Sequence, residues 1–353
     1  MSPDPDISPA TYATDWDAFI SSPGPLLALA PMQDVTTLPF WKLMACFGGA
    51  DVYYTEYFRV TAGSRLDKSI LASITKNPTG RPVIAQLIGN DIEALVRNAL
   101  ELGNYPILAI DLNLGCPAPV VYRKCAGGGL LRDLPRVDAI LGALRDVIPG
   151  RFTIKTRLGF DDERTIDALL PIFARHSPDL LTVHGRTVKQ MYRDGVRYDL
   201  IARAVQAMAC PVLANGNVSS AEVAQGILNE TGARGLMIGR GAIRNPWIFQ
   251  QIRCHLLGQP VSQPTGRDVL DYIHALYDAA TSPGVSEQVE VHAMKKYTNF
   301  IGSGLPDSAR FLHDIRRVSC RSDFFAVCER SLNNDFLLSL DPAPPDPELS
   351  AAA

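Results

Sequence analysis

The sequence lacks the features that define several protein classes. Its seven cysteines are odd in number and include no C-x-x-C pair, so neither a disulfide framework nor a zinc or iron–sulfur cluster is predicted. No apolar stretch approaches the ~20 residues that a membrane helix requires. The first residues are acidic and proline-rich, where an export signal would need a basic start and an apolar core. We therefore expect a soluble, cytoplasmic protein with reduced thiols, no bound metal and no membrane contact.

An overall excess of basic residues is also missing. The formal net charge is −3 and the isoelectric point is near 6.1, whereas nucleic-acid binding usually comes with a clear basic excess. This balance excludes a chain that is basic throughout. It leaves room for a local basic surface, because phosphates respond to the field of a cleft or stripe rather than to the average charge.

What the sequence does contain is a regular alternation of short apolar runs with longer helical patterns. Eight such runs occupy residues 26–30, 52–55, 83–87, 108–112, 152–156, 180–183, 212–214 and 235–238. Eight strand–helix units predict an α/β protein built on a (β/α)8 TIM barrel, whose strands are buried on both faces. An open doubly wound sheet is the alternative. Its dinucleotide-binding form would carry G-x-G-x-x-G after a strand, and the sequence has no such match.

The C-terminal part of the chain follows a different pattern. A closing barrel helix is predicted over residues 247–257, followed by a linker that contains Pro, Ser and Thr. Helical periodicity then predicts helices over residues 267–280, 287–301, 306–319 and 322–331. The predicted parts of the chain are a flexible N-terminal extension (1–24), a barrel domain (25–258), a smaller all-helical domain (265–340) and a disordered tail (341–353).

Polar residues follow nearly every predicted strand. Active sites of (β/α)8 barrels lie at the C-terminal ends of the strands, so these residues are expected to meet at one rim. In chain order the strand ends supply Pro31 and Met32, Glu56, Gln86, Asn113 with Cys116, Lys155 with Arg157, His184 with Arg186, Asn215, and Gly239 to Gly241. Any one of them alone is explained as a capping or loop residue. The convergence of all eight strand ends predicts an active site.

The motifs at these strand ends resemble those of the tRNA-dihydrouridine synthases. The string Asp-Leu-Asn-Leu-Gly-Cys-Pro at residues 111–117 is similar to the active-site loop of that family. Further motifs occur in the same order as in the family, namely Ala-Pro-Met (30–32), Gln-Leu-Ile-Gly (86–89), Lys-Thr-Arg-Leu-Gly (155–159), His-Gly-Arg-Thr (184–187), Ala-Asn-Gly (214–216) and Ile-Gly-Arg-Gly (238–241). The resemblance implies an FMN-binding barrel that uses NADPH to reduce the C5–C6 bond of a uridine in tRNA.

The resemblance assigns the role of proton donor to Cys116. Uracil reduction needs a hydride at C6 and a proton at C5, and a flavin delivers the hydride only from the face on which it stacks. A separate acid must stand opposite, and a thiol that is largely protonated at neutral pH suits this role. A buried structural cysteine is the alternative interpretation. Cys125 is a rival thiol, but it lies outside the Asn-x-Gly-Cys-Pro context.

Other rim residues are expected to bind the cofactor. Lys155 would place a cation against reduced flavin, which carries negative charge at N1 and O2. The amide of Gln86 would pair with the flavin N3–O4 edge, while Asn113 would hold the uracil. Loops after the last two strands would bind phosphate. The predicted cofactor residues are Pro31, Met32, Gln86, Lys155, His184, Asn215, Gly216, Asn217, Gly239 and Arg240.

Basic and aromatic residues are predicted to bind tRNA. Arg186 would approach a nucleotide phosphate, and Tyr192 would stack beside an extruded base. Cations at helical spacing in the C-terminal domain predict a stripe that follows tRNA phosphates. The residues assigned to this stripe are Lys295, Lys296, Arg317 and Arg321. A solvated face balanced by nearby acidic residues is the alternative interpretation.

Two other functions stay open on the sequence alone. A dihydroorotate dehydrogenase-like enzyme would also combine a flavin barrel with an Asn-x-x-Cys-Pro-like loop, although such enzymes lack the helical C-terminal domain. A non-catalytic RNA-binding barrel would have little use for Cys116, Lys155 and the phosphate loops together. Strings at residues 55–60, 127–133 and 184–193 look most like the bacterial C-type branch, which implies uridine-16 of the D-loop as the target. We expect the protein to be a monomer.

Overall fold

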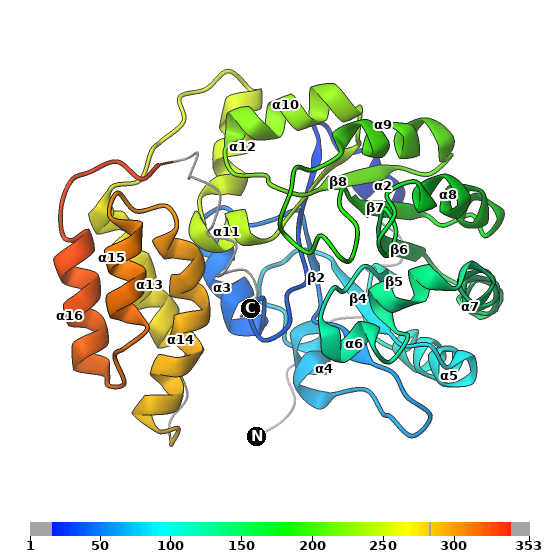
Figure 1. Cartoon of the computed structure of the whole chain (residues 1–353), viewed down its shortest axis with the longest axis horizontal. Helices are drawn as coiled ribbons and strands as arrows, with labels where there is room; N and C mark the ends of the chain where they lie inside the picture. Colours follow the sequence, from blue (N-terminus) through cyan, green and yellow to red (C-terminus); the bar gives the residue numbers. More distant parts are fainter. Residues whose placement is uncertain (1–15, 282–283, 340–353) are drawn as a thin grey trace. The chain divides into compact units, whose positions relative to one another are not determined.

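A parallel barrel forms the centre of the fold. The computed structural model describes residues 16–281 and 284–339. Its barrel strands are β1 (Leu26–Leu29), β2 (Val52–Tyr54), β4 (Val83–Ile88), β5 (Ala109–Leu114), β6 (Phe152–Arg157), β7 (Leu180–His184), β8 (Val212–Asn215) and β9 (Gly235–Ile238). Each strand pairs with the next, and the pairings of β1 with β9 and of β2 with β4 close the ring (Figure 1). The predicted (β/α)8 barrel and all eight of its strands are confirmed.

The barrel strands are buried because both of their faces meet other parts of the protein. Every residue of β1, β4, β5 and β7 is buried. Strand β6 departs from this pattern at one position, since Lys155 keeps partial exposure between buried neighbours. A short strand that the sequence did not reveal, β3 (Phe58–Arg59), pairs with β4 outside the eight-strand ring.

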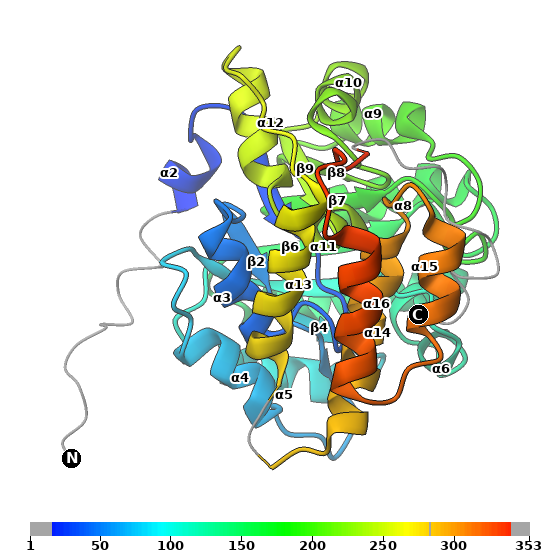
Figure 2. The ribbon, with the colours of Figure 1, turned by 90° about the vertical axis from the view of Figure 1, so that its left-hand side faces the viewer.

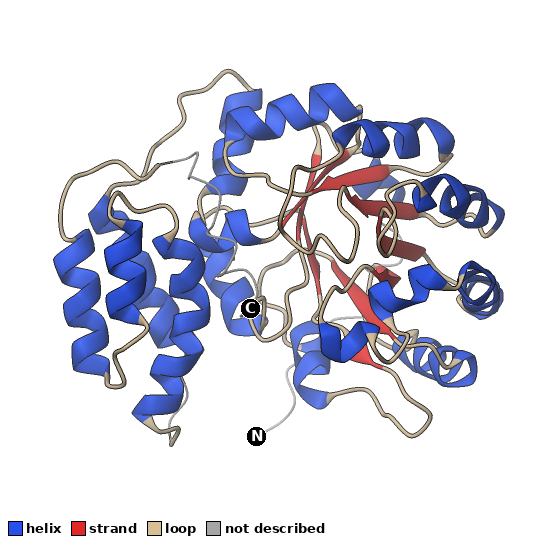
Figure 3. Ribbon diagram, viewed as in Figure 1, coloured by secondary structure: helices blue, strands red, loops and turns tan. Residues whose placement is uncertain are grey.

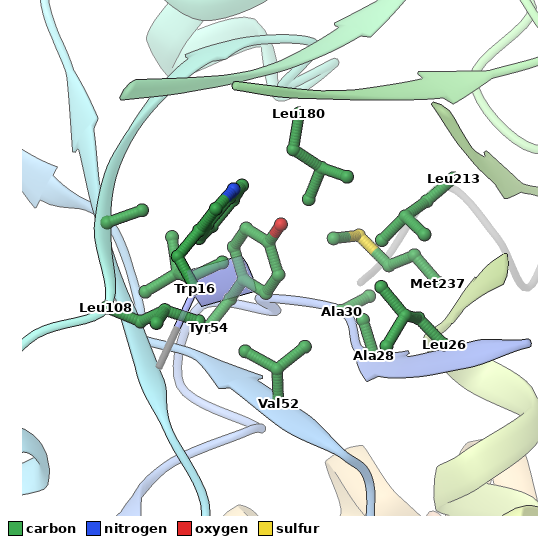
Figure 4. Packing of buried hydrophobic residues seen from close by; sticks show 12 residues of the cluster. Trp16, Leu26, Ala28, Ala30, Val52, Tyr54, Leu108, Leu180, Leu213 and Met237 are labelled. Atoms are coloured by element: carbon green, nitrogen blue, oxygen red, sulfur yellow. The ribbon is translucent and has the colours of Figure 1, made fainter. Parts of the chain in front are cut away.

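The N-terminal part of the described chain contributes to the barrel core. Figure 4 shows Trp16, from α2 (Trp16–Ile20), beside Tyr54, in a buried cluster that also contains Leu180 and Leu213. Arg234 donates hydrogen bonds to the carbonyls of residues 20, 22 and 24, at 2.8, 2.7 and 2.5 Å. Residues 16–24 are thus held by the buried side chain of Trp16 and by hydrogen bonds from the half-buried Arg234, while the boundary of the N-terminal extension at residue 24 stays a prediction. Residues 1–15, and the predicted tail at 341–353, lie outside the described residues.

Helices cover the outside of the barrel ring (Figure 3). They are α4 (Lys68–Thr75), α5 (Ile92–Leu102), α7 (Leu134–Val147), α8 (Thr165–Arg175), α9 (Tyr198–Ala207) and α10 (Ala221–Thr231). Asp67, Asp91 and Asp133 each accept backbone N–H groups at the start of a helix, which explains where α4, α5 and α7 begin. Between β5 and α7 lie the short helix α6 (Pro119–Tyr122) and the 3-10 helix η1 (Gly127–Arg132).

The chain divides into two compact units. Of the described residues, the first unit contains 16–33, 51–216 and 227–237, and the second contains 34–50, 217–226, 238–281 and 284–339. The helices that lie entirely in the second unit are α3 (Leu38–Cys46), α11 (Arg240–Arg244), α12 (Ile248–Leu256), α13 (Gly266–Ala280), α14 (Glu287–Gly302), α15 (Ser308–Ile315) and α16 (Arg321–Leu332). The domain boundary at residues 258–265 stays a prediction, since this unit includes segments that the sequence assigned to the barrel.

The C-terminal helices pack around an aromatic core within the second unit. Figure 2 shows α13 and α16 running side by side, and these helices also contact each other in the packing of the unit. Tyr277 of α13 lies 5.9 Å from Phe324 of α16, measured between ring centroids. Helix α13 begins with a capping box in which Thr265 and Asp268 exchange hydrogen bonds. The four predicted C-terminal helices are confirmed, with the third shorter than expected.

Candidate active site

Polar residues of β4, β5 and β6 share one level inside the barrel. Parallel pairing places Gln86 opposite Asp111 and Asp111 opposite Thr153. The carboxylate of Asp111 is fully buried and accepts hydrogen bonds from Thr153 Oγ1 at 2.6 Å and from Gln86 Nε2 at 2.8 Å. Burial raises the pKa of Asp111 to about 6, although these two hydrogen bonds and the charge of Lys155 oppose the shift. The barrel thus holds a carboxylate that the sequence had not assigned to the site.

Asn113 connects this level to the loop that carries Cys116. Its Nδ2 donates to Gln86 Oε1 at 2.8 Å, and its Oδ1 accepts from the backbone N–H groups of Gly115 and Cys116 at 2.9 Å each. Gln86 and Asn113 were predicted to contact flavin and uracil. In the structure they also form the internal support of the Cys116 loop, and their roles toward ligands stay predictions.

The environment of Cys116 suits a thiol that acts as an acid. Burial raises its pKa above the ordinary value, while a backbone hydrogen bond and three nearby cations, Arg157, Lys155 and Arg59, lower it. The net effect keeps the thiol protonated at neutral pH. The side chain is nevertheless partly exposed, so a substrate can reach it. A proton donor needs both properties.

The rival thiol of Cys125 has a different setting. Cys125 is exposed, has a positive φ of 53°, and lies 3.9 Å from the guanidinium of Arg132. The glycines that open η1 follow Cys125 in the chain and pack against the Cys116 loop. Gly128 donates its N–H to Cys116 O at 3.2 Å, and a Cβ at Gly128 would lie 2.9 Å from that oxygen. The glycine permits close packing against the Cys116 loop, and Cys125 takes no part in the polar network of Asn113.

Lys155 has few partners for a charged group. Its Nζ donates to Asn215 Oδ1 at 3.4 Å, which is its one hydrogen bond within the described part of the chain. Its pKa is lowered to about 8, mainly by burial and also by the charge of Arg157, while the charges of Asp111 and Cys116 oppose the shift. An ammonium with unused donors and a depressed pKa is suited to an anionic ligand.

Asn215 fixes the tautomer of His184. Asn215 Nδ2 donates to the Met237 carbonyl at 2.7 Å, so its Oδ1 must be the atom that lies 2.9 Å from His184 Nδ1. The proton of the imidazole therefore resides on Nδ1. Burial, aided by Arg157, Lys155 and Arg186, lowers the pKa of His184 well below its ordinary range. His184 is thus a neutral ring at neutral pH.

Arg157 is a site residue to which the sequence analysis gave no role. Its side chain is 2% exposed. The guanidinium donates to the carbonyls of Gly115 at 2.9 Å, Thr187 at 2.9 Å and Met191 at 2.7 Å. It therefore ties the Cys116 loop to the loop after β7. Its position two residues after Lys155 on one strand was the available signal, because such residues point to the same face of the sheet.

Arg186 and Tyr192 also belong to the loop after β7. Arg186 is 1% exposed and donates to the carbonyls of Arg193 and Asp194, at 2.7 to 3.0 Å. The ring of Tyr192 lies 6.4 Å from His184, measured between centroids. Arg186 thus shapes the loop from inside, a role that the predicted phosphate contact did not anticipate. Its phosphate contact and the base stacking of Tyr192 stay predictions.

Three further cofactor predictions fall in the first unit. Pro31 and Met32 follow β1 and are half-buried. Gly216 follows β8 with a φ of +134°, a conformation that side chains rarely adopt, and a Cβ there would lie 3.0 Å from Val196. Glycine is therefore required at this turn by the backbone itself, whatever binds beside it.

The predicted phosphate residues Asn217, Gly239 and Arg240 belong to the second unit. Asn217 follows β8 by two residues and has a positive φ of 47°. Arg240 follows β9 by two residues, and its Nη2 donates to Asn217 Oδ1 at 3.3 Å. The structure thus brings Asn217 and Arg240 together. Their contact with a phosphate stays a prediction.

The predicted tRNA-binding cations differ in how they are held within the second unit. Lys295 donates to the Arg316 carbonyl at 2.9 Å, and Lys296 lies 3.7 Å from the carboxylate of Asp34. Arg317 donates to the carbonyl of His313 at 2.8 Å. Arg321 stacks on two rings, at 4.8 Å from the Tyr277 centroid and 5.6 Å from that of Phe325. Arg317 is therefore bound locally by a single carbonyl, while Arg321 is part of an aromatic cluster.

Comparison with known proteins identifies the family. The family described as "Dihydrouridine synthase (Dus)" matches residues 28–335. The chain belongs to the dihydrouridine synthase family. A "tRNA-dihydrouridine synthase B" of Pseudomonas syringae pv. tomato is 37% identical over 262 residues, which cover 71% of this chain and 76% of that protein. A "tRNA-dihydrouridine(16) synthase" of Ralstonia nicotianae is 32% identical over 320 residues, or 87% of this chain and 96% of that protein.

A solved structure agrees with the fold of this dihydrouridine synthase. Histamine dehydrogenase from Rhizobium sp. 4-9 superposes with a TM-score of 0.50 at 12% identity, covering 72% of this chain and 49% of that one. This likeness concerns the barrel fold alone. The predictions of family and of an oxidoreductase enzyme are confirmed by the family match, since dihydrouridine is the reduced form of uridine.

Two features are absent from the described residues of this dihydrouridine synthase. In residues 16–281 and 284–339, no helix has the length and apolar character needed to cross a membrane. In the same ranges, His, Cys, Asp and Glu side chains nowhere gather in groups of three or more that could hold a metal ion.

Proposed function

We propose that this dihydrouridine synthase reduces uridine-16 in the D-loop of tRNA, with FMN as its cofactor and NADPH as the electron donor. Relatives from Rickettsia, Pseudomonas and Ralstonia are named as tRNA-dihydrouridine synthases, which supports tRNA as the substrate. Those from Ralstonia and Neisseria are named for position 16. We also propose that the enzyme acts as a cytoplasmic monomer.

One observation carries the proposal. A protonated, partly exposed thiol at Cys116 sits on a loop anchored by Asn113, and Asn113 pairs across the strands with Lys155. An acid and a cation with unused hydrogen-bond donors are therefore held at the ends of adjacent strands. Reduction of a polarised C=C bond needs this combination, because a proton must be added on one side and negative charge must be stabilised on the other.

The residues of the first unit fit a flavin. The Lys155 ammonium has one long hydrogen bond, so its remaining donors suit the anionic edge of a reduced isoalloxazine. Gln86 and Asn113 each have one amide N–H beyond the bonds described, which suits ring carbonyl oxygens. When bound, FMN supplies the hydride that adds to C6 of uracil.

Cys116 then donates its proton to C5. The S–H bond breaks as the C5–H bond forms, and the thiolate that remains lies near the cations Arg157, Lys155 and Arg59. These charges stabilise the thiolate, which lowers the barrier to proton transfer. Partial exposure lets solvent return a proton to Cys116 before the next turnover.

The protonation states of His184 and Lys155 suit a bound anion. His184 stays neutral because it is buried beside three cations, so it can approach a ligand without adding positive charge. Lys155 has a pKa of about 8 without a ligand, and an anion beside it would raise this value. Lys155 is therefore expected to be fully charged when flavin is bound.

Mapping of the product tests the proposal. The purified protein should be yellow, and with NADPH it should convert unmodified tRNA so that mass spectrometry finds dihydrouridine at position 16. Colourless protein that micromolar FMN does not reconstitute would contradict the cofactor. Dihydrouridine at another position would contradict the target, and reduction of free orotate or oxidation of dihydroorotate would favour a dihydroorotate dehydrogenase-like enzyme. Colourless protein that binds tRNA without reducing it would favour a non-catalytic RNA-binding barrel.

A further inference from the structure

A continuous row of hydrogen bonds runs from the barrel interior to the Cys116 loop. Thr153 Oγ1 and Gln86 Nε2 donate to the two oxygens of Asp111, at 2.6 and 2.8 Å. Asn113 Nδ2 donates to Gln86 Oε1 at 2.8 Å, and Asn113 Oδ1 accepts from the N–H groups of Gly115 and Cys116. Every side chain in this row is buried, from Thr153 at 1% exposure to Asn113 at 6%.

The charge at one end of the row decides the direction of every bond in it. An ionised carboxylate only accepts hydrogen bonds, so Gln86 must turn its nitrogen toward Asp111 and its oxygen toward Asn113. Asn113 must then turn its nitrogen toward Gln86 and its oxygen toward the loop. If the Asn113 amide turned over, its N–H would face the N–H groups of Gly115 and Cys116, and both of these bonds would be lost.

We propose that Asp111 is a positioning residue that fixes the orientation of the Gln86 and Asn113 amides and thereby holds the Cys116 loop. The inference rests on the proposed function only in giving Cys116 the role of proton donor. Three successive hydrogen bonds separate Asp111 from Cys116, so Asp111 acts through the two amides between them.

A purely structural role explains Asp111 less well. An ionised carboxylate with two hydrogen bonds and no exposure is unfavourable, and burial accordingly raises its pKa to about 6. A neutral asparagine of nearly the same size would fill the same space without this penalty. A carboxylate, unlike asparagine, has no N–H donor. The Gln86 amide can therefore bond to it only through its nitrogen, which fixes the orientation of that amide.

The direction of the row also determines what the site offers to a ligand. Asn113 Oδ1 already accepts two N–H groups, and Gln86 Oε1 already accepts one. The unused groups of both amides therefore include an N–H donor. A ring that presents carbonyl oxygens, such as uracil, matches these donors, whereas a ring that presents an amino group there would oppose them.

Alkylation of Cys116 tests the inference without flavin or tRNA. Flavin-free protein at pH 8 is treated with iodoacetamide, and the rate at each cysteine is followed by peptide-resolved mass spectrometry. Asp111→Leu removes the acceptor, so the freed loop should expose Cys116 and its alkylation should accelerate about tenfold, the effect of losing one such hydrogen bond. The exposed thiols of Cys46 and Cys125 should react at unchanged rates and serve as internal controls.

Two further variants distinguish the effect of Asp111 on amide orientation from its effect on side-chain packing. Asp111→Asn can still turn an oxygen toward Gln86 and its nitrogen toward Thr153, so alkylation of Cys116 should stay within about threefold of wild type. Thr153→Val removes the other hydrogen-bond donor to Asp111 and leaves the bond from Gln86 intact. The alkylation rate of Cys116 in this variant should therefore also stay close to that of wild type. In the holoenzyme, Asp111→Leu should lower the maximal rate of dihydrouridine formation about tenfold and leave KM for tRNA within about twofold.

Each outcome decides the inference. Wild-type alkylation of Cys116 in a folded Asp111→Leu protein, or equal acceleration in Thr153→Val, would overturn it. If Asp111→Leu does not fold, Gln86→Met breaks the same row one link later, and unchanged alkylation of Cys116 in that variant would also overturn it. If wild-type enzyme forms no dihydrouridine at all, the proposed function fails, while the alkylation result still decides the role of Asp111.

Discussion

The barrel interior and the C-terminal helices hold their charges in opposite ways. Asp111 and Arg157 are at most 2% exposed, and their partners are identified at hydrogen-bond distance. In the helices, the side chains of Lys296 and Arg321 are 42% and 54% exposed, and their nearest carboxylates lie 3.7 Å away. The same residue types thus occur as fixed parts of a network in one region and as loosely paired surface charges in the other.

This difference predicts how each region responds to mutation. A buried charge has no water to replace a lost partner, so removing one group disturbs pKa values and bond directions nearby. An exposed charge is screened by salt and exchanges partners readily, so each contributes little and many act together. Barrel variants should therefore change the chemistry steeply, and helix variants should change tRNA affinity in a graded, salt-dependent manner.

Removal of the proton donor should have the largest effect. Cys116→Ala should slow reoxidation of reduced enzyme by tRNA about a hundred- to ten-thousand-fold, the usual loss for a positioned general acid. FMN content and NADPH oxidation by the free enzyme should stay near wild type. Cys125→Ala is the matched control and should change the rate far less. Anaerobic single-turnover reoxidation measures both rates, and a larger loss in Cys125→Ala would show that Cys125 is the proton donor.

The buried carboxylate predicts a specific pH dependence of stability. Its pKa is about 6 in the folded protein and near 3.8 when unfolded, so the folded state takes up the proton first as pH falls. Wild type should therefore gain up to about 3 kcal/mol of unfolding free energy, relative to Asp111→Asn, between pH 7 and pH 4. Two titratable groups on neighbouring strands face Asp111. They are the ammonium of Lys155 on β6 and the phenol of Tyr54 on β2.

Denaturant unfolding at several pH values measures this difference. Thr153→Val retains the titrating carboxylate and is the control, so it should show the same pH trend as wild type. A constant difference between wild type and Asp111→Asn across the range would mean that Asp111 does not titrate as a buried isolated acid.

Replacement of the barrel cation should have an intermediate effect. Lys155→Met removes a group that is suited to charge-assisted bonding, and FMN affinity should fall roughly ten- to hundredfold. The ligand-free protein should lose no stability at pH 7, because the depressed pKa of Lys155 means that its charge is disfavoured there. Lys189→Met, at an exposed lysine of the loop after β7, is the control. Flavin titration followed by fluorescence measures the affinities, and equal values for both variants would contradict the role of Lys155.

Replacement of the helix cations should give the smallest effect, which is a change in tRNA affinity and in its dependence on salt concentration. Arg317→Glu should weaken tRNA binding and reduce the slope of log affinity against log salt by about one, since one phosphate contact is lost. Arg321→Glu should do the same, and the double variant about twice as much. Arg321 also stacks on Tyr277, so the melting temperature of its variant must be measured to detect a loss of stability. Arg317 has no such ring contact among the described residues, and its variant needs no such control. Unchanged affinity and slope would place the tRNA-binding surface elsewhere.

Several features of the fold and of the site were predicted correctly from the sequence alone. Continuous apolar runs marked all eight barrel strands because a strand buried on both faces has no polar side. The rim motifs led to Cys116, Lys155, His184 and Asn215, and hydrogen bonds connect Lys155 and His184 through Asn215. Residues 16–24 escaped detection, because burial of Trp16 depends on barrel residues far along the chain.

The sequence by itself thus determined the strand pattern, the helical C-terminal region and the residues gathered at the strand ends, since each depends on local periodicity or on short motifs. Only the tertiary structure decided what those residues are bonded to. Strand register placed Asp111 between Gln86 and Thr153, and loop geometry brought the Arg157 guanidinium to the carbonyl of Gly115. These partners are 25 to 42 residues apart in the chain, and a hydrogen bond requires placement within a few tenths of an ångström, which no local pattern encodes.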